Sequence, residues 1–86
     1  MDVQKPSVGR IVHYVSYGTP NGEYAPEHRA AIITAVREVE PLDGEINAII
    51  QVDLCVLNPT GFFFNTNVKH DEETMTGGSW HWPERV

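Results

Sequence analysis

The sequence predicts an all-β domain, either a small SH3-like barrel or a strongly bent antiparallel sheet of about five strands. Three observations support this fold class. Residues 46–57 alternate between an apolar and a polar face, as a strand with one buried face does. β-branched and aromatic residues are abundant in the other expected strands. Short clusters rich in glycine, proline and asparagine separate these strands and mark turns.

The first expected strand covers residues 9–17. Odd-numbered residues share one of its faces and even-numbered residues the other: Ile11, His13, Val15 and Tyr17 against Val12, Tyr14 and Ser16. A loop follows at residues 18–28 and contains two glycines, two prolines and an Asn-Gly step. Loops of this length are often functional.

Residues 29–38 carry mixed signals. Ala30, Ala31 and Ala35 favour a helix, whereas the β-branched residues among them favour a strand. We expect a strand here. The alternative is an open antiparallel sheet that Ala30–Glu38 covers as a helix.

The next segment contains the clearest strand signal. Asp43-Gly44 is the strongest hairpin signal in the chain, and it leads into the long strand at residues 46–57. The core face of this strand is expected to consist of Ile46, Ala48, Ile50, Val52, Leu54 and Val56, with Asn47, Gln51 and Asp53 on the opposite face.

Two further strands are expected after it. A turn at residues 58–61, with proline second and glycine fourth, returns the chain as a strand at 62–68 that pairs with residues 54–57. A polar loop at 69–79 then precedes a short last strand at 80–82, which a proline ends.

Size and charge limit the possible functions. The chain is expected to form one domain, residues 1–86, with residues 1–8 as a flexible N-terminal tail. Its formal net charge is −6 and its six basic residues are scattered, so neither duplex DNA nor an anionic membrane is an expected partner. No secretory signal or long apolar segment is evident, and the single cysteine fits a reducing compartment, so we expect a cytoplasmic protein.

No local motif for catalysis or metal binding is evident. The nitrogen and sulfur donors show none of the spacings typical of zinc sites: His13, His28, His70, His81 and Cys55. Cys55 is flanked by Leu54 and Val56 and is expected to be a buried, unreactive thiol. We therefore expect no catalytic residue, no metal site and no cofactor, and we do not expect an enzyme.

The aromatic residues suggest an interface. Phe62, Phe63 and Phe64 cannot all point inward from one strand, so at least one is exposed or covered by a partner. Trp80 and Trp82 share a face of the last strand, and at least one of them is expected in the core. Together with the small core of a short chain, this surplus predicts a homo-oligomer.

A site for a planar anionic ligand is expected where the loop at 18–28 meets the last strand. Aromatic faces and hydrogen-bond donors are both available there: Tyr17, Tyr24, Trp80 and Trp82 for stacking, and His28, Arg29 and His81 for donation. Arg29 is the expected anion contact, because its planar guanidinium can bind phosphate oxygens in pairs.

Four segments resemble a group of short proteins encoded by actinobacteria-infecting phages and by actinobacterial genomes: GRIVHYVSYG, RAAIITAV, LCVLNPTGFFFN and GGSWHWPE. The similarity covers residues 9–84, and the GRIVHY opening and the WHWPE ending are its most distinctive parts. The resemblance implies a phage protein acting in the host cell cytoplasm, without implying a role for any residue.

Small phage proteins without catalytic motifs are often inhibitors of host defence, and some of those inhibitors sequester nucleotide signals. By this analogy we expect a non-enzymatic protein that binds a small nucleotide immune signal at an oligomer interface. The alternative is a protein-interaction module or a minor virion component.

Overall fold

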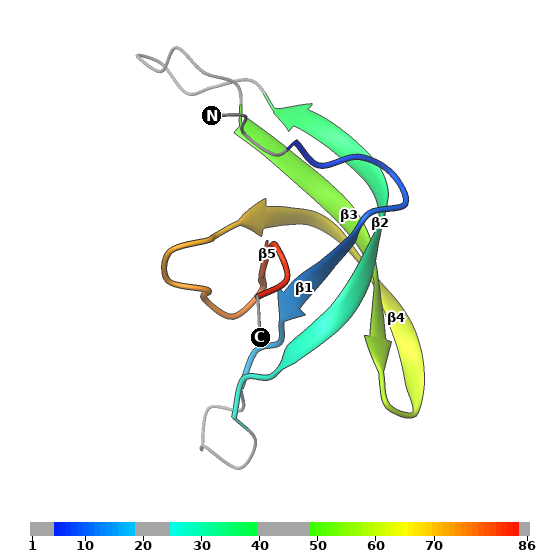
Figure 1. Cartoon of the computed structure of the whole chain (residues 1–86), viewed down its shortest axis with the longest axis vertical. Coiled ribbons are helices and arrows are strands. Elements are labelled where there is room, and N and C mark those ends of the chain that lie inside the picture. The colour runs from blue at the N-terminus through cyan, green and yellow to red at the C-terminus, as the bar shows by residue number, and fades with distance from the viewer. Residues whose placement is uncertain (1–4, 19–24, 40–48, 85–86) are drawn as a thin grey trace.

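The computed structural model describes residues 5–18, 25–39 and 49–84. Five strands form a closed barrel in the order in which they occur in the chain (Figure 1). Their bounds are β1 Ile11–Val15, β2 His28–Val39, β3 Ile49–Asn58, β4 Gly61–His70 and β5 Ser79–His81. The all-β prediction is therefore confirmed, and the barrel, not the open sheet, is the form adopted. The helical alternative for Ala30–Glu38 is wrong, because this segment lies within β2.

The barrel closes through a short last strand. Neighbouring strands are antiparallel except β4 and β5, which run parallel. β2 is the longest strand with 12 residues, and β3 and β4 have 10 residues each. The register shifts between Ile33 and Ala35 of β2 and between Val52 and Leu54 of β3. Such bulges bend and twist strands, which a five-stranded sheet needs in order to close.

The core confirms the expected alternation along β3. Its buried side chains come from all five strands: Val12, Tyr14, Ala31, Ile33, Val52, Leu54, Val56, Val68 and Trp80. Ile50 is only half-buried near the start of β3. The expected core positions Ile46 and Ala48 lie outside the described residues, as does the Asp43-Gly44 turn.

The environment of Cys55 differs from the one expected. It is half-buried, not buried, because it points to the outer face of β3 while its neighbours Leu54 and Val56 point into the core.

The two tryptophans behave as expected from their spacing. Trp80 is 1% exposed in the core, and Trp82 packs partly buried against it with the ring centroids 5.2 Å apart.

All three consecutive phenylalanines of β4 are exposed at their side chains. β4 pairs with the end of β3 as expected, with Phe64 opposite Cys55 and Phe62 opposite Leu57. Phe63, the least exposed of the three, meets the Tyr14 ring edge-on at 6.1 Å. In the part of the chain that the structure describes, no helix is long and apolar enough to cross a membrane.

Candidate metal centre

Three neighbouring strands, β2, β1 and β5, each place one histidine on the outer face of the barrel. Tyr14 of β1 points into the core, so the adjacent His13 points outward. His13 lies directly opposite His81 of β5. On its other side, His13 lies opposite Ala30 of β2, which shares a face with His28 two residues earlier.

The segment after β5 brings the carboxylate of Glu84 among these three rings. Glu84 Oε2 lies 2.7 Å from His13 Nδ1. Glu84 Oε1 lies 2.7 Å from His28 Nδ1 and 2.6 Å from His81 Nε2. One nitrogen or oxygen atom from each residue lies within 4.8 Å of all the others. These four residues are a candidate site for a metal ion, and we call this candidate site the metal centre.

The metal centre is buried on one side and open on the other. The side chain of His81 is 0% exposed, whereas those of His28 and Glu84 are 42% and 38% exposed. The His81 ring meets the rings of His28 and His13 edge-on, with centroids 4.8 and 5.6 Å apart. This arrangement directs ring nitrogens, not ring faces, at the carboxylate.

Contacts upstream of Glu84 fix its position. The backbone N–H of Trp82 donates to Glu72 Oε1 at 3.0 Å, and the same oxygen lies 2.8 Å from His70 Nε2. The guanidinium of Arg10 lies over the Trp82 ring at 5.0 Å from its centroid, within the range of a cation–π contact. Trp82 is therefore held at its backbone by Glu72 and at its ring by Arg10, which positions the chain just before Glu84.

The carboxylate of Glu84 is ionised at neutral pH. Its partial desolvation raises its pKa, but hydrogen bonds from His81, from its own backbone amide, and from His13 and His28 together outweigh this effect. The net result lowers the pKa of Glu84 to about 2. A metal ligand must be deprotonated, and Glu84 meets that requirement.

Two chemical states fit this geometry. In the first, the named histidine nitrogens carry protons and donate three hydrogen bonds to one carboxylate. In the second, the same nitrogens present lone pairs to a metal ion that the carboxylate also binds. Zinc binds histidine nitrogen at about 2.0–2.1 Å and carboxylate oxygen at about 2.0–2.2 Å, so ligand atoms in a tetrahedral site lie about 3.4 Å apart. The nitrogen–oxygen distances of 2.6–2.7 Å are shorter than this spacing, and all the ligand atoms lie within 4.8 Å of one another, so the side chains would have to adjust around an ion.

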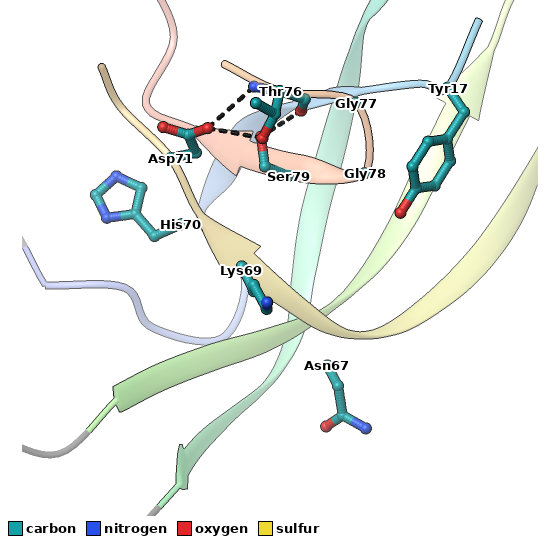
Figure 2. A pocket seen from close by; sticks show the side chains of 9 residues that line it. All are labelled: Tyr17, Asn67, Lys69, His70, Asp71, Thr76, Gly77, Gly78 and Ser79. Carbon is teal, nitrogen blue, oxygen red and sulfur yellow. Dashed lines mark hydrogen bonds between the residues drawn. The ribbon is translucent and has the colours of Figure 1, made fainter. Parts of the chain in front are cut away.

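A second polar feature lies beside β5, on the side of β4 (Figure 2). It is a hollow of about 380 Å³, open to solvent. Its lining comes from β4, from the loop before β5, from the first residue of β5 and from the chain after β1: Tyr17, Asn67, Lys69, His70, Asp71, Thr76, Gly77, Gly78 and Ser79. Asp71 accepts hydrogen bonds from the backbone and hydroxyl groups of Thr74 and Thr76, so it shapes the loop that forms one wall.

The ligand site expected from the sequence is only partly assembled. His28 and His81 come together, within the metal centre. Trp80 is buried, with His70 stacked on its ring at a centroid distance of 4.2 Å, and Trp82 packs against the core. Two further expected residues lie elsewhere: Tyr17 at the hollow and Arg29 half-buried in β2 opposite Tyr14. Tyr24 is outside the described residues.

Sequence reasoning missed His13 and Glu84 as site residues, and it expected no convergence of the histidines. The four residues are spread over the whole chain, so no spacing motif marks them. The available signal was the alternation of the first strand, which puts His13 on the face opposite to Tyr14. Its pairing with His81 depends on how the barrel closes.

No family model, curated protein or solved structure matches this chain.

Proposed function

We propose that this domain binds one zinc ion at the metal centre and that the ion fastens the closed barrel. The observation that carries the proposal is the convergence of one nitrogen from each of three histidines on the carboxylate of Glu84, at 2.6–2.7 Å. Three imidazoles and one carboxylate suit zinc, whereas magnesium and calcium require mainly oxygen ligands.

The position of the metal centre supports a structural role for the ion. β5 has three residues, and two residue pairs join it to β1 and two to β4. A zinc ion would link β1, β2, β5 and the segment after β5 at one point. Four protein ligands complete a tetrahedral shell, which is typical of structural zinc sites; catalytic sites keep one position for water. We therefore propose a non-enzymatic domain that binds zinc and whose barrel the bound ion stabilises.

Zinc titration with a competing chromogenic chelator, together with native mass spectrometry, tests the proposal. We expect one zinc per chain and a higher thermal midpoint in excess zinc, since a ligand at about 100 times its Kd adds about 2.7 kcal/mol. His28→Gln and Glu84→Gln should each weaken zinc binding at least tenfold.

The matched control is Glu73→Gln, which makes the same chemical change as Glu84→Gln. Glu73 is an exposed residue of the loop between β4 and β5, and it lies outside the metal centre. This variant should bind zinc like the parent protein. Zinc binding that is absent from the parent, or unchanged in both His28→Gln and Glu84→Gln, would contradict the proposal.

A second proposal concerns the hollow of Figure 2, which suits a small anionic ligand with a planar group, such as a nucleotide. Tyr17 is 74% exposed and offers a ring face, and Lys69 makes no ion pair with any described residue. The hollow has the volume of a small-molecule site. Asp71, also in the lining, opposes an anion, although its oxygens already accept hydrogen bonds from the loop.

Calorimetry with cyclic nucleotides and with inorganic phosphate tests this second proposal. A lost charge-assisted hydrogen bond costs about 1.5–3 kcal/mol, so Lys69→Met should weaken binding about 10–150-fold. Lys5→Met, which removes an exposed lysine outside the hollow, is the control. No binding by the parent, or equal binding by Lys69→Met, would refute it.

A further inference from the structure

An apolar stripe crosses the outer face of four strands. The register places Ile11 of β1 opposite Ile32 of β2, Ile32 opposite Cys55 of β3, and Cys55 opposite Phe64 of β4. These four side chains therefore form one continuous row on the outside of the barrel.

A second, shorter row adjoins the first. Leu57 and Phe62 lie opposite each other on the same outer face, each two residues from a member of the first row. The rings of Phe62 and Phe64 contact each other edge-on, with centroids 5.7 Å apart. We call these six residues the apolar stripe: Ile11, Ile32, Cys55, Leu57, Phe62 and Phe64.

The stripe is widely exposed to solvent. Phe64 is 69% exposed, Phe62 is 64%, Ile11 is 58% and Leu57 is 40%. With about 150–250 Å² for a whole aromatic side chain, these four residues present roughly 400 Å² of apolar surface. That is the size of the largest apolar patch on a typical monomer, where such patches are often functional.

We propose that the apolar stripe binds a second copy of this chain in a two-fold symmetric dimer. A standard interface buries about 800 Å² per partner, of which somewhat more than half is apolar. The stripe alone supplies nearly all of that apolar area. In a two-fold dimer the same patch faces itself, so one exposed stripe on each copy is sufficient.

The stripe itself contains no charged residue, so apolar contact is what it can offer a partner. The formal net charge of −6 makes two copies repel each other at long range, and the apolar contact has to outweigh this repulsion. Dimerisation also adds buried surface to a chain whose own core is small.

Light scattering coupled to size exclusion, on zinc-loaded protein at about 5–200 µM, tests the proposal. We expect the mass of two chains at the upper concentrations. The double substitution Phe62→Ser and Phe64→Ser should return the mass of one chain throughout, because both side chains are already exposed and their loss opens no core cavity. Circular dichroism and zinc stoichiometry should stay as in the parent, which separates this result from the zinc proposal.

Tyr17→Ser is the matched control, since it removes an equally exposed aromatic ring from outside the stripe. It should keep the dimer. A parent protein that is monomeric at about 200 µM would overturn the proposal. A dimer that survives the double substitution would overturn it as well, because the contact would then lie elsewhere on the barrel.

Discussion

The guanidinium of Arg37 holds the carboxylate of Asp53 across β2 and β3 with two parallel hydrogen bonds. Arg37 Nε donates to Oδ1 at 3.0 Å and Nη2 donates to Oδ2 at 2.6 Å. Asp53 also accepts the backbone N–H of Asn67 at 3.0 Å. At this point one residue of β3 faces two of β4, and Asn67 adopts a positive φ of 53°. The carboxylate thus stabilises the bulge that bends β4.

Replacing Asp53 with alanine should lower stability by about 1–2 kcal/mol, because both the ion pair and the bond to the bulge are lost. Arg37→Ala should cost less, since its side chain is 52% exposed and exposed ion pairs contribute little, while Asp53 keeps its bond to Asn67. Urea unfolding of the two variants measures which of them loses more stability. A larger loss in Arg37→Ala would show that the bulge bond is unimportant.

Leu54→Ala should destabilise the barrel by about 2–4 kcal/mol, since Leu54 is 0% exposed in the core and its truncation leaves a cavity. Leu57→Ala on the same strand is the control, because Leu57 is 40% exposed on the outer face. Its effect on the unfolding free energy of the monomer should stay below about 1 kcal/mol. Equal effects would mean that the two faces of β3 are wrongly assigned.

The alternation of apolar and polar residues, together with the turn signals, was enough to predict the strands that form the barrel. The apolar face of β3 follows directly from Val52, Leu54 and Val56, and the Asn-Pro-Thr-Gly turn gives the pairing of β3 with β4. The ambiguity of residues 29–38 arose from local helix propensity. It is resolved by the pairing of β2 with β1 on one side and with β3 on the other, which satisfies its backbone hydrogen bonds and buries Ala31 and Ile33.

The metal centre could not be predicted in the same way. It depends on the register between β1 and β5, which is set where the chain closes, and on Glu84, which lies beyond the last strand. His81 is buried on the outer face, where His13, His28 and Glu84 contact its ring, so its burial depends on tertiary structure and not on strand alternation. The outward position of His13 was available from the alternation alone.

Gly78→Ala should lower the thermal midpoint clearly, for two reasons. Gly78 has a φ of +85°, which costs a residue with a side chain about 1–2 kcal/mol. A Cβ there would also clash with the hydroxyl oxygen of Tyr17, so that exposed ring must move. Gly61→Ala is the control, because nothing lies within 4 Å of its Cβ position.

Adding Tyr17→Ser to Gly78→Ala separates the two causes. The double variant should recover only the part due to the clash with the ring, because the backbone strain remains. Full recovery would show that the left-handed backbone at Gly78 carries no cost, and a midpoint for Gly78→Ala equal to that of Gly61→Ala would contradict the prediction altogether.

Asp71 should make the barrel sensitive to acid. Hydrogen bonds from the hydroxyl and backbone groups of Thr74 and Thr76 hold the pKa of Asp71 well below its ordinary value of 3.8. A carboxyl whose pKa is lower in the folded state adds stability above its unfolded pKa, and that stability is lost as the pH falls through the folded value. The contribution should therefore be complete at neutral pH and decline below about pH 3.8.

Thermal unfolding in chelator from pH 7 to pH 2 measures this contribution without interference from metal binding. Asp71→Asn should have a lower midpoint than the parent at pH 7, and the difference should narrow toward pH 2 as the parent carboxylate takes up its proton. Glu73→Gln, which removes an exposed carboxylate two residues away, should follow the parent at every pH. A midpoint difference for Asp71→Asn that stays constant with pH would mean that the loop is held by the shape of the side chain and not by its charge.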